Sequence, residues 1–404
     1  MKSVSKIILA AALTLTFQGC IEKIEYVQFD DPALFSPTKS EVTDLSQGIP
    51  SNPLSSVVET KSSSVDMPTI LKGMILGVYG SNVHSISGTY WSVDQNGDPI
   101  RLSGKVILPA SGKIRNYILV SHYTIGGDFE APSNSFQLEG ILATDGYALI
   151  MPDYIGFGAT AHLPHPYLCA HLTARNVVDM LLAVDPYLRK IGRAPEDSSI
   201  YLMGYSQGGA TTMAVQRLLE SEYADKYKIR RNFAGGGPYD ISATYDNAIE
   251  NDYLGIPCAI PMIIIGMNVG ERLDLNYEDY FRPFLLEHYS EWILDKNYNV
   301  HQIAALMKTK ILSDFLTPEA MEKRSPGTRK FYMAMMHNSV LRGWQPQAPV
   351  YMFHSQDDDT VPFLNSQLAK EAFKNCNIEY NFGHYGSHIL GALRFILTVH
   401  EILK

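Results

Sequence analysis

Apolar residues recur along this chain in two alternating patterns, short continuous runs and longer stretches with helical spacing. Residues 117–120 and 147–151 are continuous apolar runs, which are typical of strands buried on both faces of a sheet. Between residues 170 and 182, apolar side chains recur every three or four positions, which predicts an amphipathic helix that ends before Pro186. A further apolar run at residues 200–203 is followed by helical spacing. This alternation predicts an α/β fold with a mostly parallel central sheet flanked by helices.

The alternation is absent in two regions. Two strand-like stretches within residues 83–109 flank an Asn-Gly step, a strong hairpin signal, so we expect the domain to begin with antiparallel strands. Residues 241–342 contain an apolar run at 260–265 and helical segments rich in Tyr, Phe, Leu and Met. We interpret this region as an inserted helical cap; the alternative is a set of extra core helices with no role over a site. A strand pattern resumes at residues 350–353.

The N-terminal part of the chain has a different character. Two lysines precede an apolar run at residues 7–17, which is shorter than the roughly 20 residues needed to span a bilayer and predicts a signal peptide. Gly19-Cys20 resembles the cleavage and lipid-attachment site of bacterial lipoproteins, and acyl chains on Cys20 would hold the mature protein at a membrane surface. An ordinary cleaved signal with an incidental cysteine is the alternative. The expected organisation is a signal peptide at 1–20, a flexible tether rich in Ser and Pro at 21–66, a core at 67–240 and 343–404, and a cap at 241–342.

Composition narrows the class of protein. The 404 residues are 46% hydrophobic and 19% charged, as in a globular protein with a substantial core, and the formal net charge of −9 gives no basic footprint for nucleic acid. The three cysteines other than Cys20 lack the spacing of a zinc site and allow at most one disulfide. We expect Cys169, Cys258 and Cys376 to be buried as small apolar residues.

The sequence G-x-S-x-G at residues 204–208 follows the apolar run at 200–203 and precedes a helical pattern. Strand, sharp turn and helix in this order are typical of a nucleophile elbow, in which a serine occupies a strained turn. Gly204 and Gly208 fit this interpretation because the strand and helix backbones crowd together there. Ser206 is therefore the candidate nucleophile; a surface serine on a glycine-bracketed turn is the alternative.

A serine hydroxyl needs a base within hydrogen-bond reach and a third group that orients the base. His388 stands at the start of the last helix directly after a loop and is the candidate base. His384, four residues earlier, is the rival.

Three consecutive aspartates follow the strand at 350–353 and are candidates for the acid. The segment 354–362 resembles H-G-x-x-D-x-x-V-P, which follows the acid-bearing strand of many α/β-hydrolases, and this register selects Asp358. Asp357 and Asp359 are the alternatives, as carboxylates that solvate the loop. A calcium site is weakly supported, because one tripeptide supplies few of the roughly six to eight oxygens that Ca²⁺ requires.

An acyl-transfer site also needs two donors for the oxyanion, and one is the backbone N–H of the residue after the nucleophile, here Gln207. The second should come from the loop at residues 121–127. His162, His165 and His171 could suggest a metal cluster, but their spacing fits no common site, so we expect no metal.

Several motifs together resemble those of the secretory lipase family, the group of Candida lipase A and its bacterial relatives. They are H-Y-T-I-G at 122–126 with A-P-S at 131–133, similar to H-G-T-T-G and A-P-S; D-Y-I-G-F-G at 153–158; and H-P-Y at 165–167. The resemblance covers residues 90 to 400 and implies a secreted serine esterase or lipase of α/β-hydrolase fold, with Thr124 as the second oxyanion donor. Tyr123 departs from the family glycine, and a bulky residue there would reshape the acyl pocket or move the Thr124 donor.

The sequence thus predicts a two-step acyl transfer from a small-molecule or lipid ester, without metal or cofactor and with membrane contact only through Cys20. Its expected location is exported, anchored in the periplasm or at the cell surface, or otherwise secreted. A polysaccharide-directed acetyl or feruloyl esterase and an exopeptidase are alternatives, because the same fold and triad serve each. A non-catalytic surface binding lipoprotein is the alternative from another class. The oligomeric state stays open.

Overall fold

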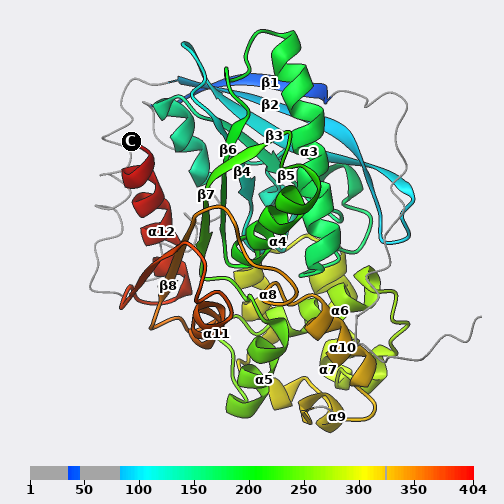
Figure 1. Ribbon diagram of the computed structural model, residues 1–404. Coiled ribbons are helices and arrows are strands. Elements are labelled where there is room, and N and C mark those ends of the chain that lie inside the picture. Colours follow the sequence, from blue (N-terminus) through cyan, green and yellow to red (C-terminus); the bar gives the residue numbers. More distant parts are fainter. Residues whose placement is uncertain (1–34, 46–81, 324) are drawn as a thin grey trace, which may run out of the picture.

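The computed structural model describes residues 35–45, 82–323 and 325–404 (Figure 1). In these residues a sheet of nine strands has the order β1-β2-β3-β5-β4-β6-β7-β8-β9. The first pairings, β1 with β2, β2 with β3 and β3 with β5, are antiparallel, and all pairings from β5 to β9 are parallel. The strands are β1 (Ser36–Asp44), β2 (Asn82–Val93), β3 (Pro99–Pro109), β4 (Tyr117–Ser121), β5 (Ala148–Pro152), β6 (Ser199–Tyr205), β7 (Lys228–Gly235), β8 (Val350–Ser355) and β9 (Ile378–Gly383). The expected fold, an antiparallel start followed by a mostly parallel sheet, is confirmed.

Helices cover both faces of the sheet. Helices α3 (Ala170–Lys190) and α4 (Gln207–Glu222) pack on one face, and α12 (His388–Leu403) packs with the 3₁₀ helix η3 (Leu138–Asp145) on the other (Figure 1). Strand β4 shows why both faces are apolar: Tyr117 and Leu119 belong to one buried cluster, whereas Ile118 and Val120 belong to the other. Because successive side chains of a strand point to opposite faces, a continuous apolar run supplies both clusters.

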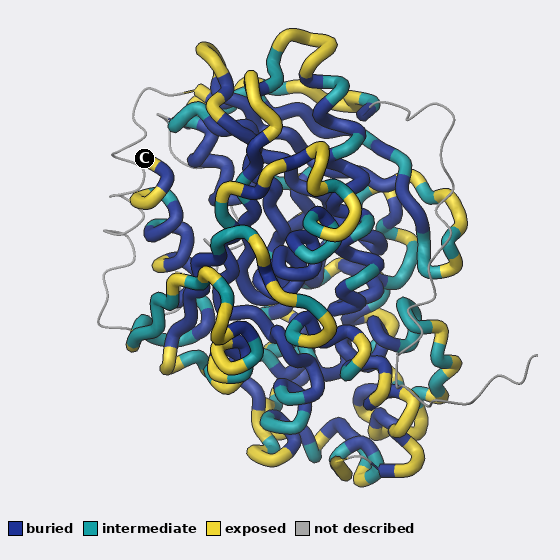
Figure 2. Tube along the Cα trace, viewed as in Figure 1, coloured by how far each residue is buried: buried dark blue, intermediate teal, exposed yellow. Residues whose placement is uncertain are grey.

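Residues 241–342 separate β7 from β8 and are mainly helical. Their helices gather beyond the carboxyl ends of the parallel strands (Figure 1), and the buried residues continue from the sheet into them (Figure 2). The α-helices of this region are α5 (Ile241–Asn251), α6 (Ala259–Gly270), α7 (Pro283–Leu286), α8 (Val300–Met307), α9 (Pro318–Met321) and α10 (Arg329–His337). Helix α11 (Leu364–Ala372) follows β8. We call residues 241–342 the cap.

The prediction that residues 21–66 form a flexible tether is wrong for part of this segment. Ser36–Asp44 forms β1, which pairs along β2 at the edge of the sheet. Phe35 and Leu45 at its two ends are buried, and the Phe35 ring contacts Tyr187 with 5.6 Å between centroids. The strand between them is mostly exposed, so it carries little of the alternation that reveals a strand in sequence. The predicted signal peptide, Cys20 and the other tether residues lie outside the described residues.

The helix expected to end before Pro186 continues to Lys190. A proline inside a helix removes one backbone hydrogen bond, but the neighbouring Asp185 anchors this turn. Its buried carboxylate accepts hydrogen bonds from the Tyr117 hydroxyl at 2.9 Å and the Tyr227 hydroxyl at 3.2 Å. Tertiary contacts therefore hold the last turn in helical form beyond the proline.

The described residues contain no helix that is both long and apolar enough to cross a membrane. Cys169 and Cys258 are free and buried, as expected, whereas Cys376 is partly exposed and its thiol contacts the Gln345 side chain.

Glu139 of η3 is a buried acid. It is 5% exposed, and its Oε2 atom has no hydrogen-bond partner among the described residues. Burial raises its pKa from 4.5 to about 7, because a low-dielectric environment disfavours the ionised carboxylate.

This shift predicts a pH-dependent loss of stability that Glu139→Gln should remove. Between pH 4.5 and 7 the unfolded chain releases this proton while the folded chain keeps it, so the free energy of unfolding falls as pH rises. Above pH 7 the full cost is about 3 kcal/mol, at about 1.4 kcal/mol per pKa unit. Urea unfolding at pH 5 and pH 8 should show an advantage of the variant that grows with pH. A constant difference would contradict the shift; Glu401→Gln, at an exposed position, is the control.

Candidate active site

Ser206 lies in a tight turn between β6 and α4. Its backbone has φ 59° and ψ −124°, a conformation that non-glycine residues rarely adopt. The flanking glycines permit the turn: a Cβ at Gly204 would lie 2.1 Å from the carbonyl oxygen of Gly208, and one at Gly208 would lie 2.0 Å from that of Ser121. Strand β6, helix α4 and the end of β4 therefore meet at this point, as a nucleophile elbow requires.

A continuous chain of hydrogen bonds joins Ser206, His388 and Asp358. The Ser206 Oγ lies 2.8 Å from the His388 Nε2, and the His388 Nδ1 lies 2.6 Å from the Asp358 Oδ2. All three side chains are buried. Because a carboxylate only accepts hydrogen bonds, the His388 Nδ1 donates to Asp358, and this orientation of the ring directs its Nε2 at the Ser206 hydroxyl.

Asp358 is held as a carboxylate by several donors. Its Oδ1 accepts hydrogen bonds from the backbone N–H groups of Thr360 at 2.9 Å and Val361 at 2.8 Å. Burial alone would raise its pKa, but His388 and His354 hold the pKa of Asp358 well below its ordinary value. The His354 Nε2 lies 3.3 Å from the Asp358 Oδ2, and neither side chain is exposed. The carboxylate is therefore ionised near neutral pH.

The alternative candidates for the base and the acid, His384, Asp357 and Asp359, make other contacts. His384 is 74% exposed and its Nδ1 lies 2.8 Å from the Asp357 Oδ1, so these two form a surface pair. Asp359 accepts the backbone N–H of His388 at 3.2 Å through its Oδ1 atom. Asp359 thus contacts the His388 backbone, and Asp358 contacts its ring.

Gln207 is the first residue of α4, so its N–H is one of the four at the start of a helix that have no acceptor within it. The Gln207 side chain is held by His165. The sequence did not predict this role of His165. The Gln207 Nε2 donates to the His165 Nε2 at 2.8 Å, and the His165 Nδ1 donates to the Ile155 carbonyl oxygen at 2.7 Å. Burial lowers the pKa of His165 to about 3, so this ring is neutral and can accept at Nε2. The H-P-Y motif was the available signal.

Thr124 and Tyr123 both line the cavity that contains Ser206. The Thr124 Oγ1 lies 2.8 Å from the Tyr167 hydroxyl, so the third residue of the H-P-Y motif contacts this loop. The departure from the family glycine at Tyr123 therefore places an aromatic side chain on the wall of the cavity.

The cavity at Ser206 and His388 lies between the core and the cap. Its volume is about 80 Å³, and its lining is mainly apolar. The cap contributes residues from α5, α6, α8 and the segment before α6: Thr244, Leu254, Ile256, Ala259, Ile260, Ile263, Val300 and His301. The sequence left open whether the apolar run at 260–265 lies over the site or only in the core. Two of its side chains, Ile260 and Ile263, line this cavity.

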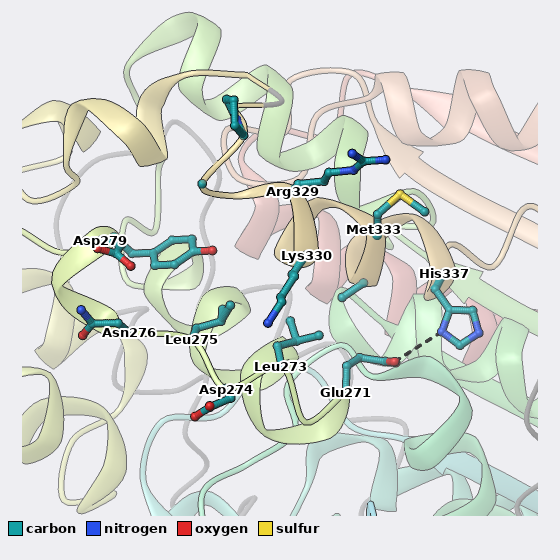
Figure 3. Close-up of a pocket in the computed structure, with 14 residues that line it drawn as sticks. Glu271, Leu273, Asp274, Leu275, Asn276, Asp279, Arg329, Lys330, Met333 and His337 are labelled. Carbon is teal, nitrogen blue, oxygen red and sulfur yellow. Dashed lines mark ion pairs between the residues drawn. The ribbon is translucent and has the colours of Figure 1, made fainter.

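A larger cavity of about 820 Å³ lies within the cap, between residues 271–280 and 326–337 (Figure 3). It shares no lining residue with the cavity at Ser206. Its walls carry charges of both signs, including the pair of His337 Nδ1 and Glu271 Oε2 at 3.4 Å. Within the described residues, no group of three or more His, Cys, Asp or Glu side chains is placed to hold a metal ion.

A serine on a strained turn between strand and helix, in a mostly parallel sheet covered on both faces, defines an α/β-hydrolase fold. Solved structures share it at low identity. The rice cell wall degrading esterase LipA from Xanthomonas oryzae is 19% identical with a TM-score of 0.71, covering 92% of this chain and 96% of that chain. Candida antarctica lipase A is 15% identical with a TM-score of 0.58, covering 89% and 81%.

The chain belongs to the secretory lipase family, whose model matches residues 133–392. A secreted triacylglycerol lipase of Malassezia restricta is 24% identical over an alignment of 286 residues that covers 68% of this chain and 56% of that protein. Another, from Malassezia furfur, is 24% identical over an alignment of 294 residues that covers 67% of this chain and 72% of that protein. The match thus spans little more than half the length of the first relative. The expected family is confirmed.

Proposed function

We propose that this protein is a serine hydrolase that cleaves carboxylic esters. The observation that carries the proposal is the hydrogen-bond chain from Ser206 through His388 to the ionised Asp358. Membership of the secretory lipase family supports the same reaction class.

In the proposed reaction, the Ser206 Oγ attacks the ester carbonyl carbon while the His388 Nε2 takes the hydroxyl proton. Asp358 stabilises the imidazolium, and the N–H groups of Gln207 and Thr124 receive the negative charge that forms on the carbonyl oxygen. The C–O bond to the alcohol then breaks and His388 returns the proton to the departing alcohol. Water attacks the acyl-enzyme with His388 again as base, and the carboxylic acid leaves.

The matched pair His388→Ala and His384→Ala tests the assignment, because the two residues are four positions apart and differ in their contacts. We expect Ser206→Ala and His388→Ala to lower kcat for p-nitrophenyl butyrate by at least about 10⁴-fold, since members of a triad act as a unit. His384→Ala should leave kcat within about twofold, because surface substitutions disturb little. Thermal unfolding checks that each variant is folded. Full turnover by folded Ser206→Ala would contradict the proposal.

The proposed substrates are lipid or other apolar esters with short acyl chains. The relatives named above are triacylglycerol lipases, and the cavity walls are mainly apolar. At about 80 Å³ the cavity is far smaller than the roughly 300–1,000 Å³ of typical ligand sites, so long acyl chains do not fit this arrangement of the cap.

We therefore expect kcat/KM to fall by at least about tenfold from p-nitrophenyl butyrate to p-nitrophenyl palmitate, because each methylene that does not fit is lost to binding. A series of esters with increasing chain length measures this. Equal values for the two esters would contradict a narrow site. Acetylated xylan and aminoacyl anilides in the same assays test the polysaccharide esterase and exopeptidase alternatives, and preferred turnover of either would replace the lipid ester as substrate.

We also propose that the protein is exported and held at a membrane by acyl chains on Cys20. The relatives named as secreted support export, and the Gly19-Cys20 step after an apolar run supports the anchor.

In a bacterial host, the full chain should enter the detergent phase after Triton X-114 separation, and Cys20→Ser should move to the aqueous phase because it lacks the acylated thiol. Cys376→Ser is the matched control and should behave as the unmodified chain does. An unmodified chain found in the aqueous phase would show that Cys20 is incidental.

A further inference from the structure

Glu130 is a buried acid in the loop that follows β4. It ends the 3₁₀ helix η2 (Asp128–Glu130), is 3% exposed, and lines the same cavity as Ser206. Its Oε2 accepts the backbone N–H groups of Gly126 and Gly127, each at 2.9 Å. One oxygen atom therefore satisfies two consecutive buried donors just after Thr124.

None of the ion pairs between described residues involves Glu130. Among these residues, no Lys or Arg side chain therefore pairs with its carboxylate. Burial raises its pKa, whereas the bonds from Gly127 and Gly126 lower it. A buried carboxylate without a cation is costly, and here its compensation comes from these two backbone donors. Their geometry is therefore tied to the position of this one side chain.

The cap backbone contacts the same loop from another direction. A Cβ at Gly126 would lie 2.6 Å from the Tyr298 carbonyl oxygen, so the loop and the segment before α8 touch through their backbones. The Asp128 N–H donates to the Lys296 carbonyl oxygen at 2.9 Å. Residues 126–128 are thus fixed by cap backbone as well as by the Glu130 carboxylate.

We propose that Glu130 is a positioning residue that fixes the loop carrying Thr124, so that the Thr124 N–H faces the oxyanion. The inference rests on the proposed function. Glu130 acts through the backbone of Gly126 and Gly127 and takes no part in proton transfer. A donor moved by loss of this support weakens transition-state binding more than substrate binding, so the effect falls on kcat.

Glu130→Ala should lower kcat for p-nitrophenyl butyrate by about 10- to 100-fold with KM within about threefold, which is less than the 100- to 1000-fold cost of deleting a donor. Glu130→Gln keeps an oxygen acceptor at the same reach and should retain at least about a third of the wild-type kcat. Glu139→Gln, a change at a second buried glutamate that bonds neither glycine N–H, is the matched control and should keep the wild-type kcat.

Glu130→Asp keeps the test decisive if the alanine variant fails to fold. Its carboxylate is one methylene shorter and cannot bond both N–H groups from the same backbone position, so we expect at least about a fivefold loss of kcat. Wild-type kcat in folded Glu130→Ala or Glu130→Asp would overturn the inference and leave the ester hydrolase intact, as would Glu130→Gln falling as low as Glu130→Ala. Absence of ester turnover by the wild-type protein itself would overturn the proposed function and this inference with it.

Discussion

The close approach of three backbones at Ser206 is the constraint on which the rest of the site depends. A residue at φ 59° persists only where the surroundings enforce it, at a cost of order 1–3 kcal/mol. Here the surroundings are the Gly204 and Gly208 backbones and the Ser121 carbonyl oxygen. They pack so closely that neither glycine could carry a Cβ. Since β4 and β6 are parallel neighbours with Ser121 opposite Gly204, the same packing sets the loop after β4 beside the serine. The proposed nucleophile and the proposed oxyanion loop are thus positioned by the same backbone packing.

His388 and Asp358 follow the last two strands in the order of the sheet, β9 and β8. Asp358 follows β8, and His388 begins α12 after β9, two strands that pair in parallel. Their loops therefore leave the same edge of the sheet as the turn after β6, and the three side chains converge without long excursions. Two backbone N–H groups and His354 surround the buried carboxylate, so its charge survives in a site from which water is largely excluded.

Much of this arrangement could be predicted because local sequence patterns determine it. The G-x-S-x-G turn, the continuous apolar strands and the acid and histidine placed after late strands all depend on neighbours in sequence. What could not be predicted depends on distant contacts: β1 is held by pairing with β2 and by Phe35, and α3 passes Pro186 because Asp185 bonds Tyr117 and Tyr227. The supporting contacts of Glu130 and His165 were missed for the same reason, since a buried acid or a neutral histidine has no sequence pattern of its own.

The central claim is that the Ser206 oxygen is a nucleophile activated by His388. Mass spectrometry of the folded protein after treatment with diethyl p-nitrophenyl phosphate tests it most directly, because the reagent traps a nucleophilic serine without requiring the right ester. The account predicts one diethylphosphoryl group per chain, located on the peptide that contains Ser206 and absent after His388→Ala. An unmodified folded protein, or an adduct only at another residue, would contradict it.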